Sequence, residues 1–471
     1  MSDVLTPDLC VIGAGSGGLS VAAGAVQMGA SVVLVERHLM GGDCLNFGCV
    51  PSKSLIAAAH AAAGMRGSGR FGIASAEPRV DAGAVRDHIR GVIDAIRPHD
   101  SPERFEGLGC TVILAEARFT ASDTVTAGGH TIRARRFVVA TGSVPAVPPI
   151  PGLADIPYLT NETVFDLAVT PAHLIVIGGG PIGLEIAQAH RRLGARVTVL
   201  EAARILPKDD PDLVKIVRQR LVEEGVEIRE GAGVSRVEQT TSGVAALVGD
   251  TRIEGSHLLV AAGRKPQFDG LDLDRAGVEH TPKGITVDRR LRTSNRRVFA
   301  LGDAAGGPAF THMAGHHASV VIQNALFRLP AKVNQRSVPW VTFTDPELAQ
   351  IGLTEAEARE RHGDGVRVVW EPFTGNDRAR AERATEGGIK LVAAKNGRVL
   401  GASIVGAHAG ELVLPWALAI DQGLKLKALA SAIVPYPTLS EISKRAAGQF
   451  YAPALFGPRV KWLVRLLAKL G

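Results

Sequence analysis

Short apolar runs alternate along the chain with glycine-rich turns and with alanine-rich or amphipathic stretches. Leu9–Ile12 lead into Gly13-Ala14-Gly15-Ser16-Gly17-Gly18, then an alanine-rich stretch, then an apolar run that ends at Glu36. This order predicts a strand, a loop, a helix and a second strand. Glycines spaced like Gly13, Gly15 and Gly18 let a backbone approach a pyrophosphate at a helix N-terminus, and Glu36 is placed to bind ribose hydroxyls.

The same pattern occurs a second time. Leu174–Ile177 precede a loop with Gly178, Gly180 and Gly183, and the next apolar run ends at Glu201. The first glycine and the acid are 23 positions apart in both copies, Gly13 to Glu36 and Gly178 to Glu201. Two matched units predict two bound dinucleotides, which suits hydride transfer from a nicotinamide to a flavin.

Two cysteines, Cys44 and Cys49, follow the first unit and are five positions apart. In a regular helix five residues rise about 7.5 Å, at or beyond the roughly 7 Å Cα limit for a disulfide. The pair therefore requires a helix that is distorted or only beginning there, which Gly48 permits, and Pro51 suits the first turn of a following helix. A cysteine near a helix N-terminus has a lowered pKa, so this position predicts that the pair is a redox couple. The alternative is two inert, buried cysteines.

Length and composition set the broad class. A chain of 471 residues predicts two to four domains. No apolar run reaches the 18 residues of a membrane span, and residues 1–7 do not resemble a signal peptide. Four cysteines are typical of a cytoplasmic protein, and Cys10 and Cys110 are predicted to be core residues. The net charge of +6 could attract anionic cofactors or a membrane surface but indicates no nucleic-acid partner.

The segment Gly41–Leu55, GGDCLNFGCVPSKSL, is similar to the active-site segment of the flavin-dependent pyridine-nucleotide disulfide oxidoreductases. Within that family it most resembles dihydrolipoamide dehydrogenases and mercuric reductases, and the resemblance runs from about residue 8 to about residue 449. It implies an α/β fold with two Rossmann-like domains, for FAD and NAD(P), and a C-terminal α+β dimerisation domain. The implied domains are 1–150 and 269–337 for FAD, 151–268 for NAD(P), 338–449 for dimerisation, and a basic amphipathic tail, 450–471.

The resemblance also implies roles for single residues. The first glycine loop would hold FAD and the second the nicotinamide cofactor. Glu201 favours NADH, because a carboxylate would repel a 2′-phosphate, while nearby Arg204 leaves NADPH open. Cys49 would be the thiol beside the flavin and Cys44 the interchange thiol. Further implied cofactor contacts are Lys53, Thr141, Gly142, Ser143, Glu185, Gly263, Asp303, Ala309, Phe310, Thr311 and His312.

Two of these residues have alternative interpretations. Glu185 could be a helix residue that only pairs with Lys53, rather than a residue near the nicotinamide. His312 and His316 have the i, i+4 spacing of a metal-binding pair, but no third ligand is evident from the sequence, and we expect no metal site.

The loop Pro435-Tyr436-Pro437-Thr438-Leu439-Ser440-Glu441 departs from the dihydrolipoamide and glutathione reductases. They have histidine where Tyr436 stands, oriented by the glutamate at Glu441, and in the family this loop reaches the active site of the partner subunit in a homodimer. Tyrosine has a reference pKa near 10, about 3.5 units above histidine, so it is a poor base at pH 7. Mercuric reductases also have tyrosine here, but their C-terminal Cys-Cys pair has no counterpart in Leu467–Gly471.

The last residues predict a short amphipathic helix. Arg459, Lys461, Arg465 and Lys469 form a basic stripe, with apolar residues on the remaining face. Residues 458–470 could lie on an anionic membrane surface or pack on their own subunit.

The sequence therefore predicts a cytoplasmic FAD enzyme, which the resemblance implies is a homodimer, with peripheral contact at the inner face of the membrane as an open possibility. It would pass electrons from NADH through FAD and the Cys44–Cys49 disulfide to a small disulfide or a thiol-binding metal ion. One alternative is a membrane-surface flavoprotein that reduces a quinone or a protein. Another is a flavin-stabilised interaction protein with vestigial turnover.

Overall fold

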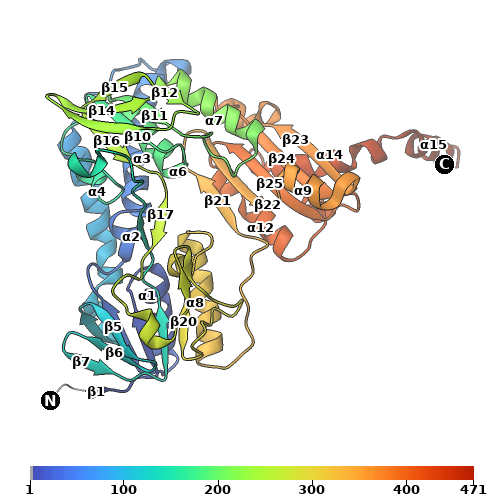
Figure 1. Cartoon of the computed structure of the whole chain (residues 1–471). Helices are drawn as coiled ribbons and strands as arrows, with labels where there is room; N and C mark the ends of the chain where they lie inside the picture. The colour runs from blue at the N-terminus through green and yellow to red at the C-terminus, as the bar shows by residue number, and fades with distance from the viewer. Residues whose placement is uncertain (1–3, 471) are drawn as a thin grey trace. The chain divides into compact units, whose positions relative to one another are not determined.

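The computed structural model describes residues 4–470 and divides them into two compact units (Figure 1). Unit 1 combines the residues up to Ala203 with Ile228–Val333, and unit 2 combines Arg204–Glu227 with the residues from Asn334 onward. The units thus do not follow the order of the chain. None of the described helices is long and apolar enough to cross a bilayer.

The first sheet of unit 1 is parallel, with the strand order β20-β8-β2-β3-β4. Its central strands, β2 (Leu9–Ile12) and β8 (Arg136–Val139), are apolar and almost completely buried, as expected where both faces of a sheet are covered. Helices α1 (Ser16–Gln27) and α8 (Thr311–Ala325) pack against each other beside it. The other strands are β3 (Val32–Glu36), β4 (Thr111–Leu114) and β20 (Val298–Ala300).

The second sheet of unit 1 repeats the same arrangement, with the order β12-β11-β10-β16. Its elements are β10 (His173–Ile177), α6 (Pro181–Arg192), β11 (Arg196–Leu200), β12 (Val226–Arg229) and β16 (His257–Val260). The chain leaves the first sheet through β9 (Ser143–Pro145) and returns through β17 (Arg264–Pro266), and these two short strands pair antiparallel. The two crossings between the sheets therefore lie side by side.

Smaller elements complete unit 1. One antiparallel sheet contains β13 (Arg236–Thr240), β14 (Gly243–Val248) and β15 (Thr251–Gly255). A four-stranded sheet contains β1 (Val4–Leu5), β5 (Ala117–Ala121), β6 (Thr124–Ala127) and β7 (His130–Ile132). The remaining long helices are α3 (Cys49–Gly67), α4 (Ala82–Ile96) and α5 (Pro102–Leu108). Cys10 and Cys110 are buried, which confirms their prediction as core residues.

Unit 2 is built on a five-stranded antiparallel sheet in the order β21-β22-β25-β24-β23. Alternate residues of β24 (Gly388–Ala394) face opposite sides, as the pleat requires. Ile389 and Leu391 join a core with Trp416 and Phe450, whereas Lys390 faces the other side. The other strands are β21 (Pro339–Thr342), β22 (Glu347–Gly352), β23 (Val366–Pro372) and β25 (Val399–Gly406). The helices include α7 (Pro211–Glu223), α9 (Glu355–His362), α14 (Glu441–Leu455) and α15 (Pro458–Leu467).

One predicted helix of unit 2 is interrupted. From the sequence alone we expect one helix over residues 410–422, whereas the structure has α11 (Ala409–Leu412) and α12 (Leu414–Asp421). Pro415 lies in the first turn of α12 and has no amide hydrogen, so it cannot donate the helical bond to residue 411. The expected helix and the structure therefore differ in the break at Val413 and by one residue at each end.

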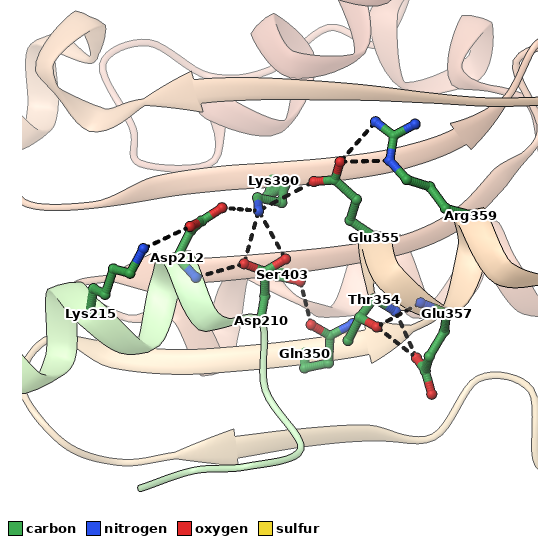
Figure 2. Close-up of polar contacts among 10 residues, drawn as sticks. All are labelled: Asp210, Asp212, Lys215, Gln350, Thr354, Glu355, Glu357, Arg359, Lys390 and Ser403. Carbon is green, nitrogen blue, oxygen red and sulfur yellow. Dashed lines mark hydrogen bonds and ion pairs between the residues drawn. The ribbon is translucent and has the colours of Figure 1, made fainter. Parts of the chain in front are cut away.

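An ion cluster around the buried pair Lys390 and Asp210 attaches α7 to the sheet of unit 2 (Figure 2). The Lys390 ammonium is 2.8 and 2.9 Å from the two carboxylate oxygens of Asp210 and 2.8 Å from Asp212. Glu355 lies 3.4 Å away. Burial of the ammonium lowers the pKa of Lys390, but the hydrogen bonds to the two aspartates outweigh that effect and keep the pKa above its usual value.

The position of Asp210 explains why this cluster matters for the fold. Its side chain caps α7 by accepting a hydrogen bond from the Asp212 amide and is almost completely buried. A buried carboxylate without a cation is costly, so α7 depends on a lysine from β24.

Replacing Lys390 with methionine should strongly destabilise unit 2. The Asp210 carboxylate would remain buried without its cation, which costs about 3–5 kcal/mol. Lys215 is the matched control, because it pairs with Asp212 at 3.4 Å but is exposed. We expect Lys390→Met to lower the urea midpoint of unfolding clearly and Lys215→Met to change the stability by no more than about 0.5 kcal/mol. Equal effects of the two variants would contradict this role of Lys390.

Candidate functional site

The two glycine loops have nearly the same geometry. Gly13 has φ of +102° and Gly178 has φ of +115°, in the region that favours glycine. A Cβ atom at Gly18 would lie 1.8 Å from the Gly13 carbonyl oxygen, and one at Gly183 would lie 2.0 Å from that of Gly178. Each loop therefore tolerates no side chain where the helix meets the strand. Gly15 and Gly180 occupy the N-cap positions of α1 and α6.

The acid at the end of the second strand is also placed alike in both copies. Glu36 accepts a 2.7 Å hydrogen bond from the Ala14 amide, and Glu201 accepts a 2.7 Å bond from the Gly179 amide. A carboxylate has about four acceptor sites, so each acid keeps capacity for a ribose hydroxyl. Both units thus fit a dinucleotide.

The helix that carries the cysteine pair is interrupted, as the cysteine spacing required. Helix α2 (Gly42–Asn46) contains Cys44 and ends before Phe47, and α3 begins at Cys49. Between them Gly48 has φ of −123° and ψ of −110°, outside helical geometry. No disulfide joins the two cysteines in this structure, and they lie close enough to share a hydrogen bond.

That hydrogen bond shifts the pKa values of the two thiols in opposite directions. Donation from Cys44 is the largest influence that lowers the pKa of Cys49, to about 6, and Thr311 and Lys53 lower it further. The Cys49 sulfur lies 3.3 Å from the Thr311 hydroxyl at the start of α8. The same bond, together with burial, raises the pKa of Cys44. The sequence predicted a lowered pKa from the helix N-terminus, whereas the main cause in the structure is the neighbouring thiol.

Lys53 links the cysteine helix to the second dinucleotide unit. Its ammonium lies 2.7 Å from the Glu185 carboxylate, so α3 and α6 are joined by an ion pair. Glu185 is largely buried. The pairing that the sequence offered as the simpler explanation of Glu185 is therefore present.

Other residues predicted to contact the flavin lie around the crossings between the two sheets. The Thr141 hydroxyl donates a hydrogen bond to the Gln267 carbonyl, and Gly142 has φ of +70°. The Ser143 hydroxyl donates a 2.5 Å hydrogen bond to Asp303. Burial raises the pKa of Asp303, although Ser143 and Arg264 oppose the effect. Gly263, with φ of +128°, directly precedes β17.

The segment before α8 is largely exposed. Ala309 and His312 are exposed, and the His312 ring stacks on Phe310 with 5.1 Å between ring centroids. Within residues 4–470, no group of three or more His, Cys, Asp or Glu side chains is arranged to hold a metal ion.

The C-terminal loop belongs to unit 2. Tyr436 is 69% exposed, and its hydroxyl donates a 3.1 Å hydrogen bond to Asp377 rather than to Glu441. That bond raises the pKa of Tyr436. Glu441 begins α14, and one of its carboxylate oxygens is buried without a hydrogen-bond partner among the described residues.

Three polar residues near the cysteine pair were missed by sequence reasoning. Asp43 precedes Cys44, and its carboxylate accepts a hydrogen bond from Asn161 at 3.0 Å and pairs with Arg264 at 3.0 Å. Arg264 also donates to the Ser143 hydroxyl at 2.7 Å. The only available signal was the charge of Asp43 inside the cysteine segment, because its partners are distant in the sequence.

Two dinucleotide units in one chain, with a cysteine pair on the interrupted helical segment that follows the first of them, define a flavoprotein disulfide reductase. The comparisons with known proteins agree. Residues 7–318 match the model of the pyridine nucleotide-disulphide oxidoreductases, and residues 338–447 match the dimerisation domain of the same family. The chain belongs to this family, whose members are FAD-dependent enzymes that use NAD(P)H. The dimerisation domain supports a homodimer.

Relatives that carry two different enzyme names have the same sequence identity to this chain. The chain is 36% identical over 450 residues to a mercuric reductase of Lysinibacillus sphaericus, covering 94% of this chain and 82% of that protein. It is 36% identical over 456 residues to a dihydrolipoyl dehydrogenase of Halobacterium salinarum, covering 93% and 95%. Sequence similarity alone does not choose between these activities.

Two solved structures share the fold. The HOCl-induced flavoprotein disulfide reductase RclA of Escherichia coli has a TM-score of 0.85 at 28% identity, covering 94% of this chain and 99% of that one. LpdA of Mycobacterium tuberculosis has a TM-score of 0.86 at 26% identity, covering 94% and 99%.

The shared hydrogen bond predicts how the reduced protein reacts with iodoacetamide, which modifies thiolates. Because the pKa of Cys49 is lowered to about 6, its alkylation rate should rise with a midpoint near pH 6 rather than near pH 9. Cys44 should react only at much higher pH. In a Cys49→Ala variant the bond that raises the pKa of Cys44 is lost, so the midpoint for Cys44 should fall.

Peptide mass spectrometry after timed alkylation separates the two sites. Cys110 is the internal control, because burial raises its pKa and no thiol partner is involved. An alkylation midpoint for Cys49 that stays near pH 9 would refute the lowered pKa of Cys49.

Proposed function

We propose that this protein passes electrons from NADH, through FAD and the Cys44–Cys49 pair, to a soft metal ion carried on thiol ligands. A small disulfide is the second acceptor class. The observation that carries the choice is Tyr436 in the C-terminal loop, which is exposed and has a raised pKa.

The electrons balance in two half-reactions. NADH and one proton reduce the Cys44–Cys49 disulfide to two thiols and leave NAD⁺, with FAD carrying the electron pair when it is bound. The dithiol then gives two electrons to the acceptor, the disulfide forms again and two protons are released. A divalent metal ion would be reduced to the metal, and a small disulfide would take up both protons as two thiols.

Tyr436 disfavours an acceptor that needs a proton shuttle. Reduction of a small disulfide releases a thiolate that must be protonated, and the best shuttle has a pKa near neutrality. The hydrogen bond to Asp377 raises the pKa of Tyr436 above its already high usual value. A soft metal ion binds thiolates directly and needs no such shuttle.

The names of relatives support the same acceptor class. Several similar proteins are named mercuric reductases, and one similar structure of RclA is a Cu(II) complex with a TM-score of 0.84. We propose that Cys44 meets the acceptor, that Cys49 lies beside the flavin, and that Tyr436 and Glu441 act from the partner subunit. The remaining contacts predicted from the sequence would bind FAD and the nicotinamide cofactor.

The nicotinamide preference is part of the proposal. Glu201 directly follows β11, and one of its carboxylate oxygens accepts a hydrogen bond from the second glycine loop. A carboxylate at this position hydrogen-bonds the ribose hydroxyl of NADH and repels the 2′-phosphate of NADPH. This supports NADH.

The acceptor can be tested with the intact protein. NADH oxidation is measured with Hg(II) in excess glutathione, with lipoamide and with a soluble quinone, each offered separately. We expect turnover with thiol-bound Hg(II), loss of that turnover in Cys44→Ala and Cys49→Ala, and slow reduction of lipoamide. Tyr436→His should raise lipoamide turnover at least about tenfold, because general acid–base catalysis contributes about 10²–10⁴-fold.

Tyr436→Phe is the matched control, since it removes the hydroxyl without supplying a base, and it should not improve lipoamide turnover. If only the quinone is reduced, and Cys49→Ala keeps that rate, the cysteine pair does not pass the electrons to the acceptor. The protein would then be a diaphorase.

Helix α15 supports a second proposal, that the protein binds an anionic lipid surface. No residue of α15 is buried, and Trp462, Val464 and Leu467 are among its exposed apolar side chains. Lys461, Arg465 and Lys469 are spaced i, i+4 and i+8, so they share one side of the helix. Arg459 and Trp462 line a shallow hollow with Pro458 and Leu463.

Charge favours lipid over a second copy of the chain as the occupant of this helix. After Glu441 the sequence has no acidic residue and six basic ones, namely Lys444, Arg445, Arg459, Lys461, Arg465 and Lys469. Two copies of this segment would repel each other. Each basic residue near an anionic membrane contributes about 1 kcal/mol, and the apolar residues add interfacial burial.

The full chain should sediment with vesicles that contain anionic lipid. We expect little binding to neutral phosphatidylcholine vesicles and weaker binding at high salt, because salt screens the attraction. A chain that ends at Gly457 and a full chain with Lys461→Glu, Arg465→Glu and Lys469→Glu should both lose binding. Both should keep the same mass by light scattering.

The outcomes distinguish a lipid surface from a second copy of the chain as the partner of α15. If truncation lowers the mass of the assembly and no variant differs in vesicle binding, α15 is part of the subunit interface and the lipid proposal is wrong.

A further inference from the structure

The cysteine segment begins against the first glycine loop, where the sequence predicts the FAD pyrophosphate. Gly41 donates a 2.9 Å hydrogen bond to the Ala14 carbonyl, and Gly15 and Gly41 form a β-bridge. A Cβ atom at Gly42 would lie only 2.7 Å from the Gly15 Cα. Asp43 is the next residue, so the backbone that carries this carboxylate lies next to the loop that would receive an anionic group.

A second carboxylate belongs to the same neighbourhood. Asp303 follows β20 and accepts the 2.5 Å hydrogen bond from Ser143. The charges of Asp43 and Asp303 influence each other, because Asp43 raises the pKa of Asp303. A pyrophosphate brings further negative charge, which two uncompensated carboxylates would oppose.

Arg264 is the cation that pairs with both carboxylates in the described part of the chain. Its guanidinium lies 3.0 Å from Asp43 and 4.0 Å from Asp303. It also donates to the Ser143 hydroxyl at 2.7 Å and to the Ser143 carbonyl at 2.9 Å. Its side chain is only 16% exposed, so water screens these interactions weakly.

The position of Arg264 in the fold explains why one residue reaches all of these groups. It is the first residue of β17, which pairs with β9 where the two crossings between the sheets lie side by side. The planar guanidinium donates in several fixed directions at once, which a lysine ammonium on a flexible stem does not reproduce.

We propose that Arg264 is a positioning residue that neutralises Asp43 and Asp303 and thereby allows the FAD pyrophosphate to bind beside Asp43. The proposal rests on the assignment of FAD to the first glycine loop. The contacts of Arg264 are with Asp43, Asp303 and Ser143. Its effect is on retention of the cofactor, so cofactor release, rather than turnover, is the quantity to measure.

The test compares FAD release from four holoproteins: the wild type, Arg264→Met, Asp43→Asn and the double variant. Free FAD is detected by its fluorescence after dilution and during a temperature ramp. We expect Arg264→Met to weaken FAD retention at least about tenfold, and Asp43→Asn alone to retain FAD as well as the wild type. The double variant should recover most of the loss, because removing the carboxylate removes the need for the cation.

Two further variants guard against a purely structural effect. Arg264→Lys keeps the charge but not the fork of donors, and should fall between the wild type and Arg264→Met. Arg252→Met removes an exposed cation that pairs with Glu238 and Glu254 in the same unit, and should leave FAD release unchanged.

The results test the role of Arg264 separately from the assignment of FAD to the first glycine loop. A wild-type protein that holds no FAD would refute the FAD assignment itself. Normal FAD retention in Arg264→Met, or a double variant no better than Arg264→Met, would refute the role of Arg264 while leaving the FAD assignment intact.

Discussion

The interruption of one helix between Asn46 and Cys49 is the constraint on which the site depends. A continuous helix would hold the two cysteines about 7.5 Å apart along its axis and on different faces. Gly48 leaves helical geometry, and a Cβ atom there would lie 2.8 Å from the Asp43 carboxylate. The break therefore favours glycine, because a side chain at this position would crowd the carboxylate and the carbonyl of Asp43. It lets the thiols share a proton, and that sharing makes Cys49 acidic.

The duplicated dinucleotide units were predictable because their signals are local. Each glycine loop, its helix and its acid lie within one continuous segment, and the close contacts at Gly18 and Gly183 follow directly from the pattern. The strand boundaries agree to within about one residue, as at β2 and β11. Residues such as Lys53 and Asp303 were identified only through the resemblance to the family, since a lone lysine or aspartate has no pattern of its own.

The remainder of the site depends on contacts between distant residues. Arg264 meets Asp43 only because β17 pairs with β9, and Lys390 reaches Asp210 across 180 positions of sequence. Neither pairing has a periodic signal. The helix expected over residues 410–422 is broken at Val413 for a different reason: Pro415 was a local signal, but the apolar pattern continued through it. Periodicity reports which face is buried, and it does not report where a backbone hydrogen bond is missing.

The electrostatics of the thiol pair also bear on how the acceptor is selected. Cys49 gains its acidity chiefly from Cys44, with smaller help from Thr311 and Lys53, all within unit 1. Tyr436 stays a neutral phenol near pH 7, because its bond to Asp377 raises its pKa. Activation of the thiol thus does not require a charge from the C-terminal loop. In the proposed function the C-terminal loop has no acid–base role, so its sequence can vary with the acceptor while the thiol pair that reduces the acceptor stays unchanged.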